Sequence, residues 1–326
     1  MAMRVTFWGV RGSLPSPAPP QTLITRTRDL LQAFFAAGHR GADDIDRFLG
    51  ALPPQQIGGY GGNTLCLEVR TERQQAIIDA GSGLRLLGYE LLKGPCGQGQ
   101  GQVHLLFTHF HWDHLIGLPF FAPIFIPGNQ IHLYAVEPDL PEVLRTLFRK
   151  PNFPVPLETL GADLVYHRLP LRQPTQLGDL TVTPYRLDHP DPCWGYRFEH
   201  QGKVFSHCAD TECTRTSRET LGPDLPLYQG VDLMVFDAQY SIQEVVEKVD
   251  WGHAAALIGL DLAISEGIKT VRFIHHEPAS SDETIAQAEA RTREYYERQK
   301  KTAREKNLPF HDVDWCFARV GTSVEI

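Results

Sequence analysis

A short segment, His109–His114, carries four residues of the types that bind metal ions. Its sequence is His-Phe-His-Trp-Asp-His, and it holds three of the 14 histidines in this chain of 326 residues. The apolar run Val103–Thr108 just before it has the length of a buried strand. The ligand-type side chains therefore stand where a strand ends and its loop begins, a place from which they can converge on one point. Neutral imidazole nitrogen and carboxylate oxygen suit a borderline divalent ion such as Zn²⁺.

The segment His109–His114 offers more donors than one tetrahedral ion with an open catalytic position can use. Two ions are therefore implied, and further ligands must come from strand ends or loops elsewhere in the chain. Four residues fit by their places in the sequence: His189, Asp210, His253 and His275. His275 competes with His276 for one position, because strand alternation sends adjacent side chains to opposite faces.

The composition indicates a globular protein and narrows its partners. Apolar residues make up 42% of the chain, which is enough for a large core. The net charge of −8 argues against a binder of duplex nucleic acid but leaves a small anionic substrate open, since metal ions create their own local field. No apolar run reaches the roughly 18 residues that a membrane span needs, and we expect no signal peptide. The six cysteines form no C-x-x-C pair, which favours reduced thiols in a cytoplasmic protein.

Short apolar runs alternate with turns and amphipathic segments, a pattern typical of an α/β protein built from stacked layers. Strands are expected at Val5–Trp8, Leu65–Val69, Ala76–Ile78, Val103–Thr108, Ile131–Tyr134, Leu180–Val182, Lys203–Phe205, Leu233–Phe236, Val271–Ile274 and Trp315–Phe317. Helices are expected at Leu84–Leu92, at His253–Ser265, and from a capping sequence at Ser280–Glu283 to about Lys306.

Residues 14–58 have the composition of an insertion. Four prolines between positions 15 and 20 form a stiff lead-in, and an amphipathic helix is expected to follow over Leu23–Phe35 and to end at Gly38. A short second helix is expected at Asp43–Leu49. Two helices without a strand between them are suited to cover the site or to pack on a partner.

The motifs follow one another in an order that spans nearly the whole chain. They are Phe7–Ser13, Gly61–Thr64, Asp79–Gly83, His109–His114, Asp188–Pro190, Ala209–Thr211, Asp237–Tyr240, Trp251–His253 and His275–His276. With them the chain resembles the metallo-β-lactamase fold hydrolases, and in particular their phosphodiesterase branch, which includes ribonuclease Z, the phosphoribosyl cyclic phosphate phosphodiesterase and bacterial cyclic-nucleotide phosphodiesterase-like proteins. The resemblance implies an α/β fold, an αββα four-layer sandwich that forms one domain over residues 1–326, with 14–58 as a helical insertion within it. Family members often dimerise, so a homodimer is expected by analogy.

The resemblance also implies how the ligands are shared between two divalent metal ions, which we expect to be zinc, with manganese as the alternative. The first ion would be held by three histidines: His109, His111 and His189. The second would be held by one carboxylate and two histidines: Asp113, His114 and His275. Asp210 would bridge the two ions. Asp79 is either a residue that fixes a ligand histidine from behind or a turn residue at a strand end.

The charges of such a site predict its substrate. Two divalent ions bring four positive charges, whereas Asp113, Asp210 and a bridging hydroxide bring three negative ones, so the net charge of +1 matches a phosphodiester monoanion. In the mechanistic hypothesis, the metal-bridging hydroxide attacks phosphorus in line. His253 stabilises the developing charge or protonates the leaving alkoxide, and Asp237 orients His253 by analogy with ribonuclease Z.

The expected substrate is a small phosphodiester, with cyclic nucleotides or cyclic phosphates as the first choice. Processing of tRNA 3′ ends fits less well, because only 21 positions separate His189 from Asp210 and leave no room for the long basic arm of ribonuclease Z. Acyl hydrolysis, as by a lactonase or thioesterase, is the alternative on the same scaffold.

Arg11 and Asn63 lie in glycine-rich turns that are suited either to approach a phosphate or only to turn the chain. Five aromatic residues are suited either to form a base-stacking wall or to pack in the core and lid, and packing is the favoured interpretation for each one: Phe120, Phe121, Phe125, Phe153 and Trp194.

Overall fold

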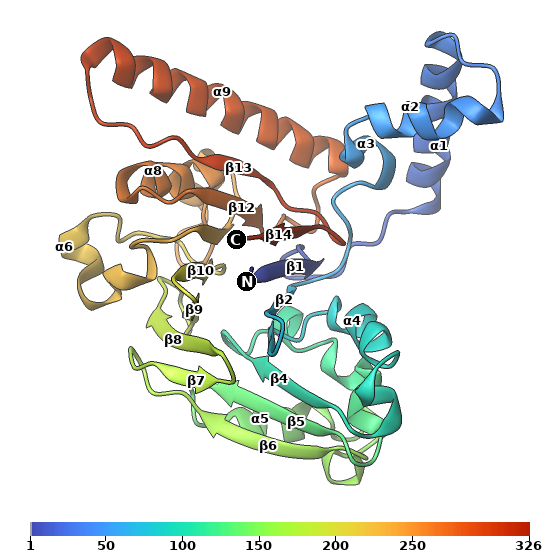
Figure 1. Ribbon diagram of the computed structural model, residues 1–326, viewed down its shortest axis with the longest axis vertical. Helices are drawn as coiled ribbons and strands as arrows, with labels where there is room; N and C mark the ends of the chain where they lie inside the picture. The colour runs from blue at the N-terminus through green and yellow to red at the C-terminus, as the bar shows by residue number, and fades with distance from the viewer. Residues whose placement is uncertain (1) are drawn as a thin grey trace.

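Two seven-stranded sheets form the body of the protein in the computed structural model, which describes residues 2–326 (Figure 1). The first sheet consists, in spatial order, of β14 (Ser323–Glu325), β1 (Arg4–Gly9), β2 (Cys66–Arg70), β3 (Gln75–Ile78), β4 (Gln102–Leu106), β5 (Gln130–Ala135) and β6 (Asp163–Arg168). The second consists of β13 (Asp314–Phe317), β12 (Thr270–Ile274), β11 (Leu233–Asp237), β10 (Lys203–Cys208), β9 (Trp194–His200), β8 (Leu180–Arg186) and β7 (Thr175–Leu177).

Both sheets are mixed, and their parallel parts carry most of the strands that precede the candidate ligands, with β8 before His189 as the exception. Strands β3 to β6 are paired in parallel in the first sheet, and β10 to β13 are paired in parallel in the second. The carboxyl ends of β4, β10, β11 and β12 lead into the segments with His109, Asp210, Asp237 and His275. Because the carboxyl ends of parallel strands meet at the same edge of a sheet, these side chains are delivered to one edge of the sandwich.

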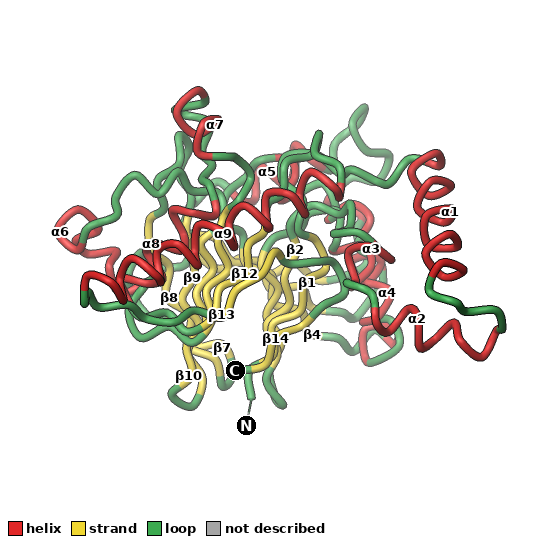
Figure 2. Tube along the Cα trace, turned by 90° about the horizontal axis from the view of Figure 1, so that it is seen from above, coloured by secondary structure: helices red, strands yellow, loops and turns green. Residues whose placement is uncertain are grey.

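Helices cover the outer face of each sheet, so the fold has four layers (Figure 2). On the first sheet, α4 (Leu84–Leu91) and α5 (Leu140–Leu147) pack on an apolar cluster that includes Leu105 and Leu133. On the second, α8 (Ala256–Glu266) and α9 (Asp282–Lys306) pack on a cluster that includes Phe236 and Phe273. A third cluster lies between the sheets. The αββα sandwich expected from the sequence is therefore confirmed.

The strands that the sequence did not reveal are mostly at the edges. Strands β6, β7 and β14 are edge strands and carry polar residues, which protect an edge from pairing with another chain but weaken the apolar pattern. Strand β9 was missed because charged Arg197 and Glu199 alternate with the buried Tyr196 and Phe198. The edge strands and β9 each have one face turned away from the core, so none of them shows the continuous apolar run by which the other strands were predicted.

One expected helix start is wrong by three residues, and the expected cap of another is off by one. The helix expected from His253 begins at Ala256, because the preceding chain turns at Gly252 (φ +86°) and runs extended at Ala255. His253 thus lies in a loop, where its ring can be aimed independently of a helix face. The long helix begins after Ser281, whose side chain accepts a hydrogen bond from the Thr284 backbone, and not at a capping box on Ser280.

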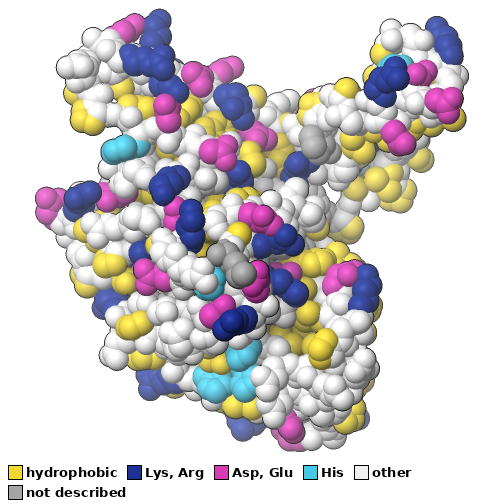
Figure 3. Space-filling model, in the orientation of Figure 1, with side chains coloured by type: hydrophobic (Ala, Val, Ile, Leu, Met, Phe, Trp, Pro, Cys, Tyr) yellow, Lys and Arg dark blue, Asp and Glu magenta, His cyan; other side chains and the backbone are white. Residues whose placement is uncertain are grey.

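The insertion forms an arm that stands away from the body (Figures 1 and 3). It consists of α1 (Pro20–Ala36), a 3₁₀ turn (Ala42–Asp44), α2 (Ile45–Ala51) and α3 (Pro54–Gly58), so the second expected helix lies two residues later than the sequence indicated. No residue of α1 is buried, and an ion pair between Arg26 and Asp282 ties the arm to the start of α9.

Among the described helices, including α6 (Arg218–Leu221) and α7 (Ile242–Glu247), none is both long and apolar enough to cross a membrane.

Candidate metal centre

Three of the histidines picked out from the sequence come together at the edge of the sheets. One ring nitrogen from each of His109, His111 and His189 lies within 4.8 Å of the other two. His109 is buried, whereas the His111 side chain is 46% exposed and its Nε2 lies 2.9 Å from a carboxylate oxygen of Asp191, itself exposed. His111 can therefore exchange Asp191 for an ion without unpacking any buried group. The structure thus brings together the three histidines of the first expected ligand set.

A second cluster lies beside the first and is fully buried. It consists of Asp113, His114, Asp210 and His275, with one ligand atom of each within 4.8 Å of the others. The Nε2 atom of His275 lies 3.0 Å from Asp210 Oδ1 and 3.2 Å from Asp113 Oδ2. The Nε2 atom of His114 lies 3.2 Å from Asp113 Oδ2 and 3.3 Å from Asp210 Oδ2. Two carboxylates and two imidazoles thus converge, which is a donor set that zinc and manganese both accept.

Unpartnered buried atoms support the presence of ions in these clusters. Eight buried side-chain nitrogen and oxygen atoms of the described residues have no hydrogen-bond partner. Four of them belong to expected ligands: His109 Nε2, His114 Nε2, His189 Nε2 and Asp210 Oδ2. A buried polar atom without a partner is costly, and several at one point indicate a group that completes them. The residues therefore fit two divalent ions, one at each cluster.

Asp79 lies directly behind the second cluster. Its Oδ2 is 2.8 Å from Nδ1 of His114, and its carboxylate also accepts hydrogen bonds of 2.8 Å from both the backbone and the hydroxyl of Thr108. With Nδ1 held in this way, Nε2 of His114 faces Asp113 and Asp210. Asp79 itself has a positive φ of 61°, the conformation of a tight turn at a strand end. These contacts agree with the interpretation in which Asp79 fixes a ligand histidine from behind. The turn at the strand end places the Asp79 carboxylate for this contact.

Two further residues hold the second cluster, and the sequence analysis gave neither a role. Gln239 Oε1 lies 2.7 Å from Nδ1 of His275, and the backbone nitrogen of Ser13 donates to Asp113 at 2.8 Å. Gln239 Nε2 in turn donates to Glu277 at 3.1 Å. The residue before Ser13 must be small, because a Cβ on Gly12 would lie 2.4 Å from His275 Nδ1. The only sequence signal was that Ser13 and Gln239 fall inside motifs shared with the family.

His275, and not His276, faces the clusters. His275 has a positive φ of 62°, so the chain turns sharply at the end of β12 and simple strand alternation does not decide the direction. His276 points into the layer under the helices, where its Nε2 donates to the carbonyl of Ala318 at 3.0 Å. Burial lowers the pKa of His276 to about 3, so this imidazole stays neutral.

Replacing Gln239 with methionine is expected to weaken metal binding by roughly 10–100-fold, because His275 loses the acceptor that fixes its tautomer and ring direction. Competition with a metal chelator measures the affinity directly and does not depend on turnover. Gln243→Met on α7, where the amide bonds only Glu247 in the structure, is the matched control. Equal metal affinity in the two variants would show that Gln239 does not position His275.

A carboxylate–imidazole pair stands next to the second cluster. Asp237 Oδ2 lies 3.0 Å from Nδ1 of His253, and the His253 ring stacks on that of His275 with centroids 4.7 Å apart. Asp237 also accepts hydrogen bonds from the backbone nitrogens of Asp210, Gln239 and Ala254 at 3.0–3.2 Å. These two residues form a further group with Asp210 and His275 that is compact enough to hold an ion. Asp237 already accepts four hydrogen bonds, so its carboxylate has no lone pair left for an ion.

The two clusters differ in protonation before any ion is bound. Burial lowers the pKa of His109 and of His189, so both imidazoles are neutral near pH 7. Burial would also lower the pKa of His275, but the carboxylates of Asp210 and Asp113 outweigh it and raise the pKa to about 10. The same two carboxylates raise the pKa of His114 well above its ordinary value. His114 and His275 therefore carry protons at pH 7, which an ion must displace.

We expect the second cluster to release about two protons when it binds a metal ion, whereas His109 and His189 of the first cluster should release about none. Below the raised pKa values of His114 and His275, protons compete with the metal ion for these two imidazoles. Because two protons are displaced, metal affinity at the second cluster should rise by up to about a hundredfold per pH unit, from about pH 7 toward pH 9. Isothermal titration calorimetry in buffers of different ionisation enthalpy counts these protons. Equal proton release for both ions would contradict the assignment.

The structure decides between alternatives that the sequence left open for the surroundings of the site. Arg11 is buried, and its guanidinium donates to the carbonyls of Gly61, Glu277 and Ser280 at 2.9–3.0 Å, so it holds loops together and does not face a phosphate. Asn63 likewise accepts a hydrogen bond from Ser82 at 3.2 Å inside its turn. Of the five aromatic residues, Phe121 and Trp194 belong to the core, as the favoured interpretation has it, whereas Phe120 is exposed and packs on Phe153 with ring centroids 5.9 Å apart.

Residues 75–276 match the protein family described as the beta-lactamase superfamily domain. The chain belongs to this superfamily, and its fold is the metallo-β-lactamase fold that the motifs predicted. Fold and site together define a hydrolase of this fold with buried His/Asp clusters that are consistent with a dinuclear metal site. A ribonuclease Z from Synechococcus sp. (strain CC9311) is 22% identical over 300 residues, which cover 74% of this chain and 92% of that protein.

Solved structures share the fold over the whole chain. The metallo-β-lactamase fold protein YhfI from Bacillus subtilis has a TM-score of 0.62 and 15% identity, with 100% of this chain and 99% of that chain covered. A diphosphatase from the PhnP family has a TM-score of 0.59 and 16% identity, with 99% and 98% covered. Yeast PDE1 has a TM-score of 0.58 and 15% identity, with 100% and 99% covered. At these identities the structures establish the fold and not the activity.

Proposed function

We propose that this protein is a phosphodiesterase that depends on two divalent metal ions and cleaves a small phosphodiester, with cyclic nucleotides as the first choice. The observation that carries the proposal is the pair of adjacent ligand clusters with the Asp237–His253 pair beside them. The relatives support it, since one is named a ribonuclease, one a diphosphatase and one PDE1. The ester class follows from the net charge of about +1 at the loaded site, which suits a phosphodiester monoanion.

Each ligand cluster has a defined task in this proposal. His109, His111 and His189 would hold one ion, and the buried cluster of Asp113, His114, Asp210 and His275 would hold the other. The chemistry that two such ions supply is water activation and stabilisation of charge on a phosphoryl group. Asp210 contributes negative charge to the buried cluster, and the two clusters adjoin each other, since the rings of His109 and His114 have centroids 4.2 Å apart.

His253 is the proposed general acid. Its Nδ1 faces Asp237, so the ring is held in the orientation that leaves Nε2 free for the leaving oxygen. The side chain is almost buried beside His275, where a transferred proton is shielded from bulk water. Asp237 is a positioning residue, because it acts on the reaction through His253.

Two exposed tryptophans near the ligand clusters support a nucleotide substrate better than the phenylalanines and Trp194 that the sequence analysis considered for base stacking. Trp112 belongs to the His109–His114 segment and is 83% exposed, and Trp251 is 64% exposed two residues before His253. The Lys248 ammonium lies 5.9 Å from the Trp251 ring, so this side of the site combines a flat apolar surface with a positive charge. A base can stack there while its phosphate lies at the clusters.

A substrate panel with the purified, metal-loaded protein tests this function. The panel contains cyclic mononucleotides, cyclic dinucleotides, aryl phosphodiesters, a tRNA precursor, lactones and thioesters. We expect turnover of small phosphodiesters and little or none of the lactones and thioesters. Preferred cleavage of a lactone or thioester would establish the acyl-hydrolase alternative, and preferred cleavage of the tRNA precursor would establish a processing endonuclease.

A further inference from the structure

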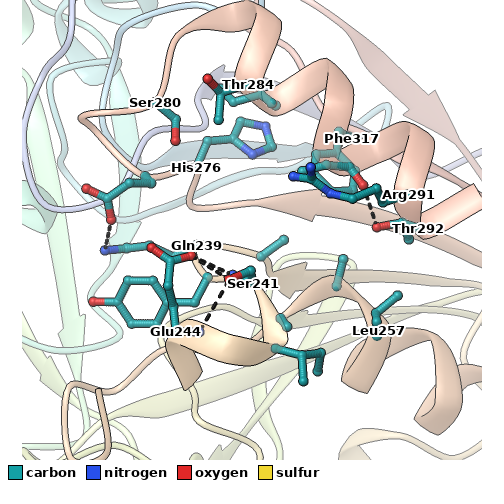
Figure 4. Close-up of a pocket in the computed structure, with 18 residues that line it drawn as sticks. Gln239, Ser241, Glu244, Leu257, His276, Ser280, Thr284, Arg291, Thr292 and Phe317 are labelled. Atoms are coloured by element: carbon teal, nitrogen blue, oxygen red, sulfur yellow. Dashed lines mark hydrogen bonds between the residues drawn. The ribbon is translucent and has the colours of Figure 1, made fainter. Parts of the chain in front are cut away.

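A cavity of about 260 Å³ lies under the outer helices of the second sheet, beside the metal centre (Figure 4). It is bounded by α8, by α9, by the end of β13 and by the loop that leads from β11 into α7. Its size is just below the roughly 300–1,000 Å³ of sites for drug-sized molecules. The cavity therefore suits a ligand that places one or two rings inside it and its remaining groups at the open mouth.

The floor of this cavity is apolar, and its mouth is open to solvent. Ala255, Ala256, Ile285 and Phe317 line the floor and are buried. The residues at the mouth are exposed: Ser241, Ile242, Thr284 and Arg291. A flat apolar floor beneath an accessible mouth is the arrangement of a small-molecule site.

One buried polar atom in the floor lacks a partner. His276 is 1% exposed and lines the cavity, its ring parallel to that of Phe317 with centroids 5.5 Å apart. Because its Nε2 donates to the Ala318 carbonyl, its Nδ1 is left as an acceptor, and this atom has no hydrogen-bond partner among the described residues. A buried acceptor in this state is expected to be completed by a donor from a bound molecule.

The mouth adds one uncompensated positive charge. No ion pair joins Arg291 to any residue of the part of the chain that the structure describes, and in Figure 4 its side chain extends from α9 over the cavity, on the side of His276. The two carboxylates of the lining are already engaged, Glu244 with Ser241 and Lys248, and Glu277 with Gln239. Arg291 is therefore available for an anionic group, which guanidinium binds with two parallel hydrogen bonds.

We propose that this cavity is a second small-molecule site, separate from the metal centre, that binds a nucleoside monophosphate. The base would lie against the apolar floor and donate from its amino group to His276 Nδ1, and the phosphate would pair with Arg291. Gln239 belongs to both sites, since it lines the cavity and bonds His275. The proposal concerns binding alone and does not depend on the reaction at the metal centre.

Calorimetric titration of the full chain with AMP, adenosine, purine riboside monophosphate and inorganic phosphate tests the site. We expect AMP to bind one equivalent, and both adenosine and the amino-free purine nucleotide to bind about tenfold more weakly, since each lacks one of the two polar contacts. Arg291→Gln should weaken AMP binding about tenfold and leave adenosine binding unchanged. Lys301→Gln, an exposed charge farther along α9, is the matched control and should change neither.

Two further variants separate the cavity from other binding modes. Ala288→Trp fills the cavity and should abolish binding of AMP and adenosine alike, with thermal unfolding as the check on folding. Asp210→Asn, which disturbs only the metal centre, should leave cavity binding in place. Three results would overturn the proposal. The parent protein does not bind AMP, or neither Arg291→Gln nor Ala288→Trp weakens its binding, or Asp210→Asn loses it.

Discussion

Replacing Asp210 with asparagine is expected to reduce metal content below two ions per chain and to lower phosphodiester turnover by at least about a thousandfold. The carboxylate is 1% exposed, lies within 3.0–3.3 Å of both His275 and His114, and carries an unpartnered Oδ2. Asparagine keeps the shape but removes the charge that draws an ion to this point. Metal content by mass spectrometry and turnover of a cyclic nucleotide measure the two effects together.

Asp232→Asn is the control for this substitution. Asp232 is also a mostly buried aspartate next to a strand of the second sheet, but it pairs with Lys269 and accepts from the Val204 backbone, away from the clusters. The control should keep two ions and near-normal turnover. If Asp210→Asn also kept both ions and full turnover, the carboxylate would not belong to the metal centre.

Replacing His253 with alanine is expected to leave metal content unchanged and to lower turnover about 10²–10⁴-fold for a substrate with an alkoxide leaving group. The imidazole contacts Asp237 and stacks on His275, but it is assigned to neither ion. The effect should be much smaller for a nitrophenyl phosphodiester, because a good leaving group departs without a proton. Rates on the two substrates, measured side by side, isolate the proton transfer.

A buried histidine elsewhere serves as the comparison. His200 on β9 is also buried, and its Nδ1 lies 3.0 Å from the Asp179 carbonyl, far along the strand from the clusters. His200→Ala should affect both substrates equally, through stability alone. Equal loss on alkyl and aryl substrates in His253→Ala would exclude the general-acid role and leave only a positioning one.

The ligand residues could be predicted because their types are rare and their local context is strong. His109–His114 follows an apolar strand, and Asp210 and His275 follow others, so each could be placed at the end of a strand before their distances were known. Their grouping followed from the resemblance to a family and not from spacing, since no sequence pattern brings residues 109, 210 and 275 to one point. The structure supplies that grouping through the parallel strands of two different sheets.

The supporting residues could not be predicted, because each acts across a long sequence separation. Ser13 donates to Asp113 from 100 positions away, and Gln239 meets His275 from 36 positions away. Neither residue type is distinctive for metal chemistry. The role of Arg11 stayed open for the same reason: a positive charge beside glycines indicates a phosphate site only when its guanidinium is free, and here three carbonyls occupy it.

The most direct test of the account is a count of metal ions on the intact chain. Native mass spectrometry of the purified protein, titrated with Zn²⁺ and then with Mn²⁺, reports how many ions each chain retains. The adjoining clusters predict two ions per chain at saturation. A chain that retains one ion or none under these conditions would contradict the claim that this site activates water between two metals.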